Sequence, residues 1–131
     1  MQVELPPLSL EEAEAIHAAV MEEYPEEPSG VLDRGLLESA LLRPAHAAEY
    51  ANADEYEQAA TLLWGLVKAH AFVQGNKRTA TAISFFFLER AGYRISAPDS
   101  AVLEIVYAVD SGEASVETVA EWFRRHTTYP E

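Results

Sequence analysis

Apolar residues recur along most of this chain every three or four positions, which is the spacing of helices. The clearest segment begins at Asp54 or Glu55 and runs to Lys68, where apolar residues recur every three or four positions and share one helical face. Comparable patterns predict helices over 9–23, over 33–42, over 77–91, from Pro98 through Val109 and from Ser115 through Phe123. The sequence contains no alternating segment long enough to predict a strand. We therefore predict an all-α domain of about six helices.

Capping and helix-breaking residues indicate where these helices end. Ser9 and Glu12 have the spacing of a capping box, which predicts a helix start. Gly92 suits the left-handed position that follows a helix end. Pro44 predicts the end of the second helix, because proline lacks the N–H that a helix interior requires. The small and polar stretch over 45–53 is then expected to be an irregular connector.

The segment over 77–91 is apolar nearly all round rather than along one face. Its apolar residues include Ala80, Ala82, Ile83, Phe85, Phe86, Phe87 and Leu88. A helix that is apolar on every side is usually buried on every side. We therefore expect this segment to be the buried central helix, with the other helices packed around it.

Length, charge and cysteine content narrow the function classes. The 131 residues, 49% of them apolar, predict one domain over 1–131, and the lack of cysteine excludes disulfides and thiolate chemistry. The net charge of −13 repels phosphate backbones, so we expect no nucleic-acid partner. The N-terminal residues do not resemble a secretory signal, and no apolar run approaches the roughly 20 residues that cross a bilayer. A cytoplasmic protein with no membrane partner is expected.

Two of the scarce basic residues, Lys77 and Arg78, stand at the start of the most apolar helix. Cations oppose the helix dipole there, whereas an anion would be held by the dipole, by free backbone N–H groups and by both side chains. Gly75 allows a ligand to approach the backbone, and Asn76 is suited either to cap the helix or to donate its amide to a ligand. This segment is therefore a candidate phosphate site.

His70 lies six residues before Asn76, on the other arm of the same predicted loop. A histidine side chain exchanges protons near neutral pH, so His70 is a candidate general base for a hydroxyl that attacks the phosphate. The alternative is that Lys77 and Arg78 are surface residues paired with acids, and that His70 is a cation at a helix C-terminus.

The run from His70 to Ala80, HAFVQGNKRTA, resembles the signature of the Fic/Doc family. That signature is histidine, any residue, phenylalanine, any residue, an acid, glycine or alanine, asparagine, lysine or glycine, and arginine. Similarity to the Doc branch extends over about 31–123, including the segments 35–41 with 43–44, 66–68, and 87–89 with 92–93. The resemblance implies the all-α Fic/Doc fold and a nucleotide-dependent enzyme that modifies proteins.

The resemblance also implies roles for individual residues. His70 would activate the hydroxyl of a target protein, and Phe72 would anchor the loop in the core. Asn76, Lys77 and Arg78 would hold nucleotide phosphates at the helix start. The implied cofactors are ATP and Mg²⁺.

Substrate and partners follow from the Doc branch by the same resemblance. Doc toxins transfer the γ-phosphoryl group of ATP to elongation factor Tu, whereas AMP-transferring Fic members usually carry a second arginine where this chain has Thr81. The resemblance therefore favours a Doc-type kinase over an AMP transferase. It also implies that the chain is the toxin of a toxin–antitoxin pair, in which a Phd-like antitoxin would fold a disordered segment into a groove beside His70.

Gln74 departs from the family pattern, which has an acid at that position to hold magnesium. A neutral amide is a weak ligand for this hard cation. One possibility is an active branch that binds the metal through the nucleotide, or through the Gln74 carbonyl and water. The other is an impaired domain that only binds a nucleotide or a peptide.

The remaining candidate sites are expected to be structural. No two histidines have a metal-binding helical spacing, so zinc is not expected and the isolated histidines are predicted to lie on the surface: His17, His46 and His126. The acids over 22–27 lack the glycine and the alternating ligands of a calcium loop, so they are predicted to be a solvated face.

Overall fold

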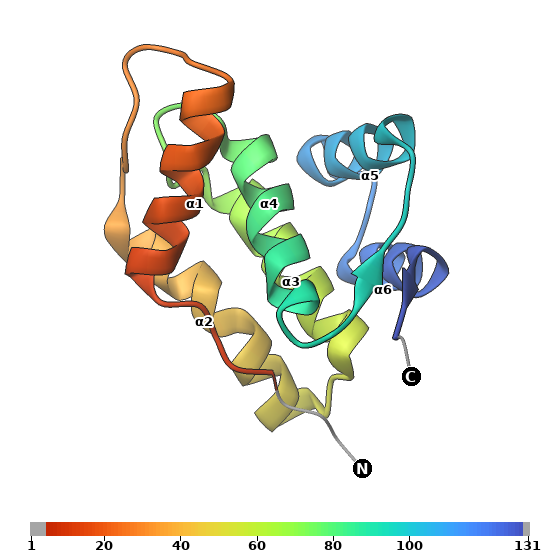
Figure 1. The fold of residues 1–131 in the computed structure, drawn as a ribbon. Helices are drawn as coiled ribbons and strands as arrows, with labels where there is room; N and C mark the ends of the chain where they lie inside the picture. Colours follow the sequence, from red (N-terminus) through yellow and green to blue (C-terminus); the bar gives the residue numbers. More distant parts are fainter. Residues whose placement is uncertain (1–4, 130–131) are drawn as a thin grey trace.

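The computed structural model describes residues 5–129, and this part of the chain contains six helices and two very short strands (Figure 1). The elements are α1 (Leu10–Glu23), α2 (Arg34–Ala51), α3 (Glu55–Ala69), α4 (Asn76–Glu89), β1 (Arg94–Ile95), α5 (Asp99–Ser111), α6 (Val116–His126) and β2 (Thr127–Thr128). The all-α prediction is confirmed. No helix within 5–129 combines the length and the hydropathy needed to cross a membrane.

Helix α3 forms the centre of the bundle. It packs against α2, α4, α5 and α6, and Figure 1 shows it running behind α4 between α2 and α6. The central helix is therefore α3 and not the segment 77–91. That segment is also not buried on every side, because Phe86 on α4 remains 38% exposed. The Arg90 guanidinium lies 5.5 Å from the centre of the Phe86 ring. A charged side chain can therefore cover part of an apolar helix that the core does not reach.

Helix α2 continues through Pro44 instead of ending there, so the predicted connector over 45–53 is also wrong. Pro44 is buried and lies on the same stripe as Leu41 and Ala48, which faces the core. The extensive packing of α2 on α3 outweighs the hydrogen bond that proline removes from the helix.

Most predicted helix starts are capped as the sequence indicates. Ser9 and Glu12 form the capping box of α1, and Ser115 accepts a hydrogen bond from the Thr118 N–H at the start of α6. Helix α4 begins one residue before the predicted position and ends at Glu89, with Gly92 in the left-handed conformation at φ 99°. No side chain caps the start of α4.

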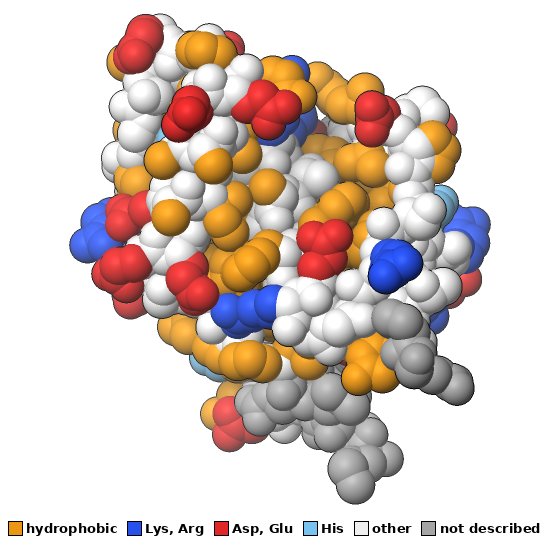
Figure 2. All heavy atoms as spheres, in the orientation of Figure 1, with side chains coloured by type: hydrophobic (Ala, Val, Ile, Leu, Met, Phe, Trp, Pro, Cys, Tyr) orange, Lys and Arg blue, Asp and Glu red, His pale blue; other side chains and the backbone are white. Residues whose placement is uncertain are grey.

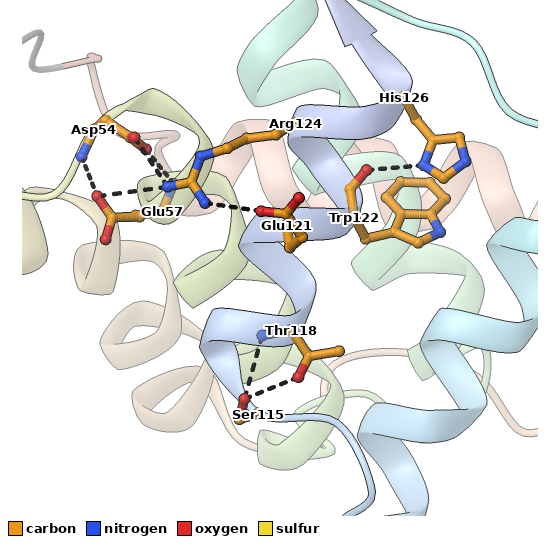
Figure 3. Close-up of polar contacts among 8 residues, drawn as sticks. All are labelled: Asp54, Glu57, Ser115, Thr118, Glu121, Trp122, Arg124 and His126. Atoms are coloured by element: carbon orange, nitrogen blue, oxygen red, sulfur yellow. Dashed lines mark hydrogen bonds and ion pairs between the residues drawn. The ribbon is translucent and has the colours of Figure 1, made fainter.

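Helix α6 is attached to the start of α3 by a cluster of charged residues (Figure 3). Asp54 caps α3 by accepting a hydrogen bond from the Glu57 N–H, and the Glu57 side chain accepts one from the Asp54 N–H. Arg124 lies 3.0 Å from the Asp54 carboxylate and 3.5 Å from Glu121. After α6, strand β2 pairs antiparallel with β1, so the C-terminal part of the chain is held against the segment that follows α4.

We expect Asp54→Ala to lower the free energy of unfolding by about 1 kcal/mol, because it removes the N-cap of α3. Arg124→Ala should cost less, about 0.5 kcal/mol, because its ion pairs are exposed to water and screened. Urea denaturation of the two variants measures both losses. A loss in Arg124→Ala that equals or exceeds that in Asp54→Ala would contradict the dominance of the cap.

Candidate functional site

The loop between α3 and α4 is closed by the side chain of Asn76. Its Oδ1 accepts a hydrogen bond from the Phe72 N–H at 3.0 Å, and its Nδ2 donates to the Phe72 carbonyl at 2.8 Å. Both ends of the loop are left-handed, with His70 at φ 48° and Gly75 at φ 73°. The Asn76 side chain therefore neither caps α4 nor points freely at a ligand, because the loop backbone engages both of its polar atoms.

Phe72 and His17 lock this loop against α1. Phe72 is buried and stacks on the His17 ring, with centroids 4.1 Å apart and planes 6° from parallel. His17 Nε2 donates a hydrogen bond to the Gln74 carbonyl oxygen at 2.9 Å. The prediction of a surface His17 is wrong, because only 4% of this residue is exposed. Its place one turn after the buried Ala13 was the sequence signal for burial.

The segment before α2 holds the same loop from another side. Val31 and Phe72 form an isolated antiparallel bridge. The Leu32 N–H donates to the Ala71 carbonyl at 2.7 Å, and the Val73 N–H donates to the Gly30 carbonyl at 3.0 Å. Backbone pairing therefore supplements the side-chain contacts, and the loop is fixed by three separate parts of the chain.

The uncapped start of α4 presents backbone donors. The Thr79 N–H is the first to bond within the helix, to the Gly75 carbonyl at 2.9 Å. The N–H groups of Asn76, Lys77 and Arg78 have no acceptor inside the helix, because such a partner would have to precede its first turn. Together with the helix dipole they form an arrangement that favours an anion.

A pocket of about 640 Å³ opens at this helix start. Figure 2 shows the surface hollowed between α1 and α5, with hydrophobic side chains inside the hollow and acidic side chains at its edges. A volume in this range is typical of small-molecule sites. The predicted site residues that line it are His70, Gln74, Gly75, Asn76, Lys77 and Arg78. Phe72 lies beneath it in the core, and of the acids over 22–27 both Glu23 and Glu26 reach its wall.

Lys77 and Arg78, the two cations that line the pocket, each contact an aromatic ring. The Arg78 guanidinium lies 4.0 Å from the centre of the Tyr24 ring, and Lys77 Nζ lies 5.2 Å from that of Tyr107. Cation–π contacts of this kind hold a charged group in place without neutralising it. Arg78 thus remains free to pair with an anion, whereas Lys77 also contacts a carboxylate.

That carboxylate belongs to Asp110 in the last turn of α5, which the sequence analysis did not identify. Its Oδ2 lies 3.4 Å from Lys77 Nζ, and its Oδ1 lies 3.5 Å from His70 Nε2. Burial acts to raise the pKa of Asp110, but the hydrogen bonds and charges of Lys77 and His70 outweigh it and hold that pKa below its ordinary value. An acid in the last turn of a helix opposes the helix dipole and is therefore unfavourable by itself. This unfavourable position was the one feature of the sequence that could have drawn attention to Asp110.

The residues around Gln74 do not form a metal cage. The Gln74 side chain is neutral, and its backbone carbonyl already accepts the hydrogen bond from His17. Within residues 5–129, no three histidine, cysteine or acidic side chains gather in a way that could hold a metal ion. The donor set therefore does not fit a magnesium ion held by the protein alone, and a magnesium ion here would rely on nucleotide phosphates.

We expect His17→Phe to keep the stack on Phe72 but to leave the Gln74 carbonyl without its donor. The free energy of unfolding should fall by about 1–2 kcal/mol, the cost of a partly buried and unpaired polar group. The control is His46→Phe, at an exposed position on α2, which should change stability by less than about 0.5 kcal/mol. Equal effects of the two substitutions in urea denaturation would contradict a role of His17 in holding the loop.

Comparisons with known proteins agree with this geometry. Residues 7–88 match the Fic/DOC family. The chain is 35% identical over 120 residues to Protein kinase doc of Escherichia phage P1, which covers 90% of this chain and 93% of that protein. It is 44% identical over 71 residues to Toxin Doc of Mycolicibacterium smegmatis, which covers 51% of this chain and 53% of that protein. The chain therefore belongs to the Fic/Doc family, and its named relatives support the Doc branch.

Proposed function

We propose that this chain is a Doc-like toxin that transfers a phosphoryl group from ATP to a hydroxyl group of a target protein. One observation carries the proposal: His70 and the uncapped start of α4, with Lys77 and Arg78, face the same pocket. Similarity along nearly the whole length of a protein named as a kinase supports it further.

The phosphates of ATP would bind where α4 begins. The backbone N–H groups of 76–78 would donate to phosphate oxygens, and Lys77 and Arg78 would supply positive charge. A chain with a net charge of −13 gains little from long-range attraction of ATP, so these local donors must provide most of the binding. Magnesium, when bound with the nucleotide, would neutralise part of the phosphate charge.

His70 would act as the general base. It would take the proton of the target hydroxyl while the hydroxyl oxygen forms a bond to the γ-phosphorus, and the bond from that phosphorus to the β–γ bridging oxygen would break to release ADP. Thr81, where AMP-transferring relatives usually carry an arginine, donates its hydroxyl to the Lys77 carbonyl and adds no charge to the pocket. This supports phosphoryl transfer over AMP transfer.

The target and partner are proposed by resemblance to Doc. The target would be elongation factor Tu, whose modification stops translation in the cytoplasm. A Phd-like antitoxin would bind beside His70 and keep the toxin inactive. The name of the mycobacterial relative, Toxin Doc, supports the assignment to a toxin–antitoxin pair.

Labelled ATP tests the reaction. We expect label from the γ-phosphate, and none from the α-phosphate, to appear on elongation factor Tu in a bacterial lysate supplied with magnesium. His70→Ala should reduce the transfer rate by roughly 10²- to 10⁴-fold, the usual contribution of a general base. His46→Ala, at an exposed residue outside the pocket, is the matched control. Label from the α-phosphate would instead establish nucleotidyl transfer, and full activity of His70→Ala would exclude its role as the base.

A second candidate function is a non-catalytic module that binds a nucleotide or a peptide. The neutral Gln74 favours it, because the residues around this position offer no carboxylate cage for magnesium. The two candidates differ in what an added carboxylate should do, so substitution of Gln74 distinguishes them.

We expect Gln74→Asp to change the transfer rate of an active kinase by less than about tenfold, because the nucleotide already carries its magnesium. Gln74→Asn, which shortens the side chain without adding charge, is the control. The same γ-label assay measures both variants. Transfer that is absent from the wild-type chain and appears only in Gln74→Asp would support the binding module instead.

A further inference from the structure

The carboxylate of Asp110 connects the two functional arms of the loop. Its oxygens contact His70 Nε2 at 3.5 Å and Lys77 Nζ at 3.4 Å, one oxygen for each partner. Among the residues that the structure describes, Asp110 is the only polar partner of the His70 ring. Asp110 lies on α5, whereas His70 and Lys77 lie far earlier in the chain. The contact forms because α4 and α5 both pack on α3.

His70 needs such a partner because little else restrains its ring. The side chain is 57% exposed, and the residue ends α3 in a left-handed conformation that places it on the rim of the pocket. A general base must be held within hydrogen-bond reach of its substrate in a defined orientation. A carboxylate also stabilises the positive charge that the imidazole acquires when it takes a proton.

The Asp110 carboxylate supports the orientation of His70, but it weakens the binding of phosphate. Asp110 places a negative charge beside Lys77, which is one of the two cations available to a bound anion. A phosphate must therefore share Lys77 with Asp110 and approach a like charge. One residue thus favours the state in which His70 is oriented and disfavours the state in which phosphate is bound.

We propose that Asp110 is a positioning residue that orients His70 for proton transfer at the expense of affinity for phosphate. Because Nε2 faces the carboxylate, Asp110 selects the tautomer with the proton on Nε2 and leaves the lone pair on Nδ1. The part that concerns transfer rests on the proposed function. The effects on anion binding and on the tautomer do not depend on it.

Two substitutions separate charge from orientation. Asp110→Asn removes the charge but keeps an oxygen that accepts a hydrogen bond, whereas Asp110→Ala removes both. Inorganic tripolyphosphate, measured by calorimetry, should bind both variants about two- to fivefold more tightly than the wild-type chain, because a like charge has been removed. The turnover number should fall about tenfold in Asp110→Ala and less in Asp110→Asn, while KM for ATP falls in both. Glu104→Gln, an exposed acid on the same helix outside the pocket, should change neither property.

Other patterns of results would overturn the proposal. A rise in both affinity and turnover would mean that Asp110 only obstructs the site, and a fall in both would mean that it only supports the structure. Unchanged binding and turnover would remove any role.

A spectroscopic readout keeps the proposal independent of the proposed function. ¹⁵N spectra of the neutral His70 ring should show a larger fraction of the Nε2–H tautomer in the wild-type chain than in Asp110→Ala, where that fraction should fall to the level of a free histidine side chain. If no γ-label is ever transferred, the proposed function fails. These spectra and the tripolyphosphate measurements then still test the contacts of Asp110 with His70 and Lys77.

Discussion

The pair of hydrogen bonds between the Asn76 side chain and the Phe72 backbone fixes the loop on which the candidate site depends. Ordering a loop residue costs about 1–2 kcal/mol of backbone entropy, whereas one hydrogen bond returns only about 0.5–1.5 kcal/mol. Two bonds from one side chain therefore cannot hold the loop without help. The stack of Phe72 on His17 and the pairing with residues 30–32 provide the remaining restraint. The backbones of His70 and Lys77 are then held on opposite arms of the loop.

The same site concentrates positive charge in an acidic protein. Lys77 and Arg78 oppose the dipole of α4, an arrangement that costs stability when no anion is present. Contacts with Tyr24 and Tyr107 hold these cations without neutralising them, and Asp110 offsets part of the charge of Lys77. The start of α4 therefore favours a nearby anion more than it favours the stability of the helix itself.

Helix α1 contributes to this arrangement through one buried histidine. His17 lies outside the motif and donates a hydrogen bond to the Gln74 carbonyl. Gln74 is the position at which this chain differs from the family signature. Gln74 thus has a structural contact through its backbone, and the residue also lines the pocket. The hydrogen bond from His17 uses the backbone of residue 74, so this contact does not require a particular side chain at that position.

The sequence by itself determined most of the helices and their caps, and it grouped the residues of the candidate phosphate site, because these features depend on residues that are close in the chain. Gly75 to Arg78 and His70 lie within nine residues, so local rules were sufficient to group them. Tertiary packing decided three other features: the continuation of α2 through Pro44, the burial of His17 and the approach of Asp110 to His70. Each depends on which helix face meets α3, α4 or the loop. Local propensity carries no information about such contacts between distant segments, so only the folded arrangement of the helices determined them.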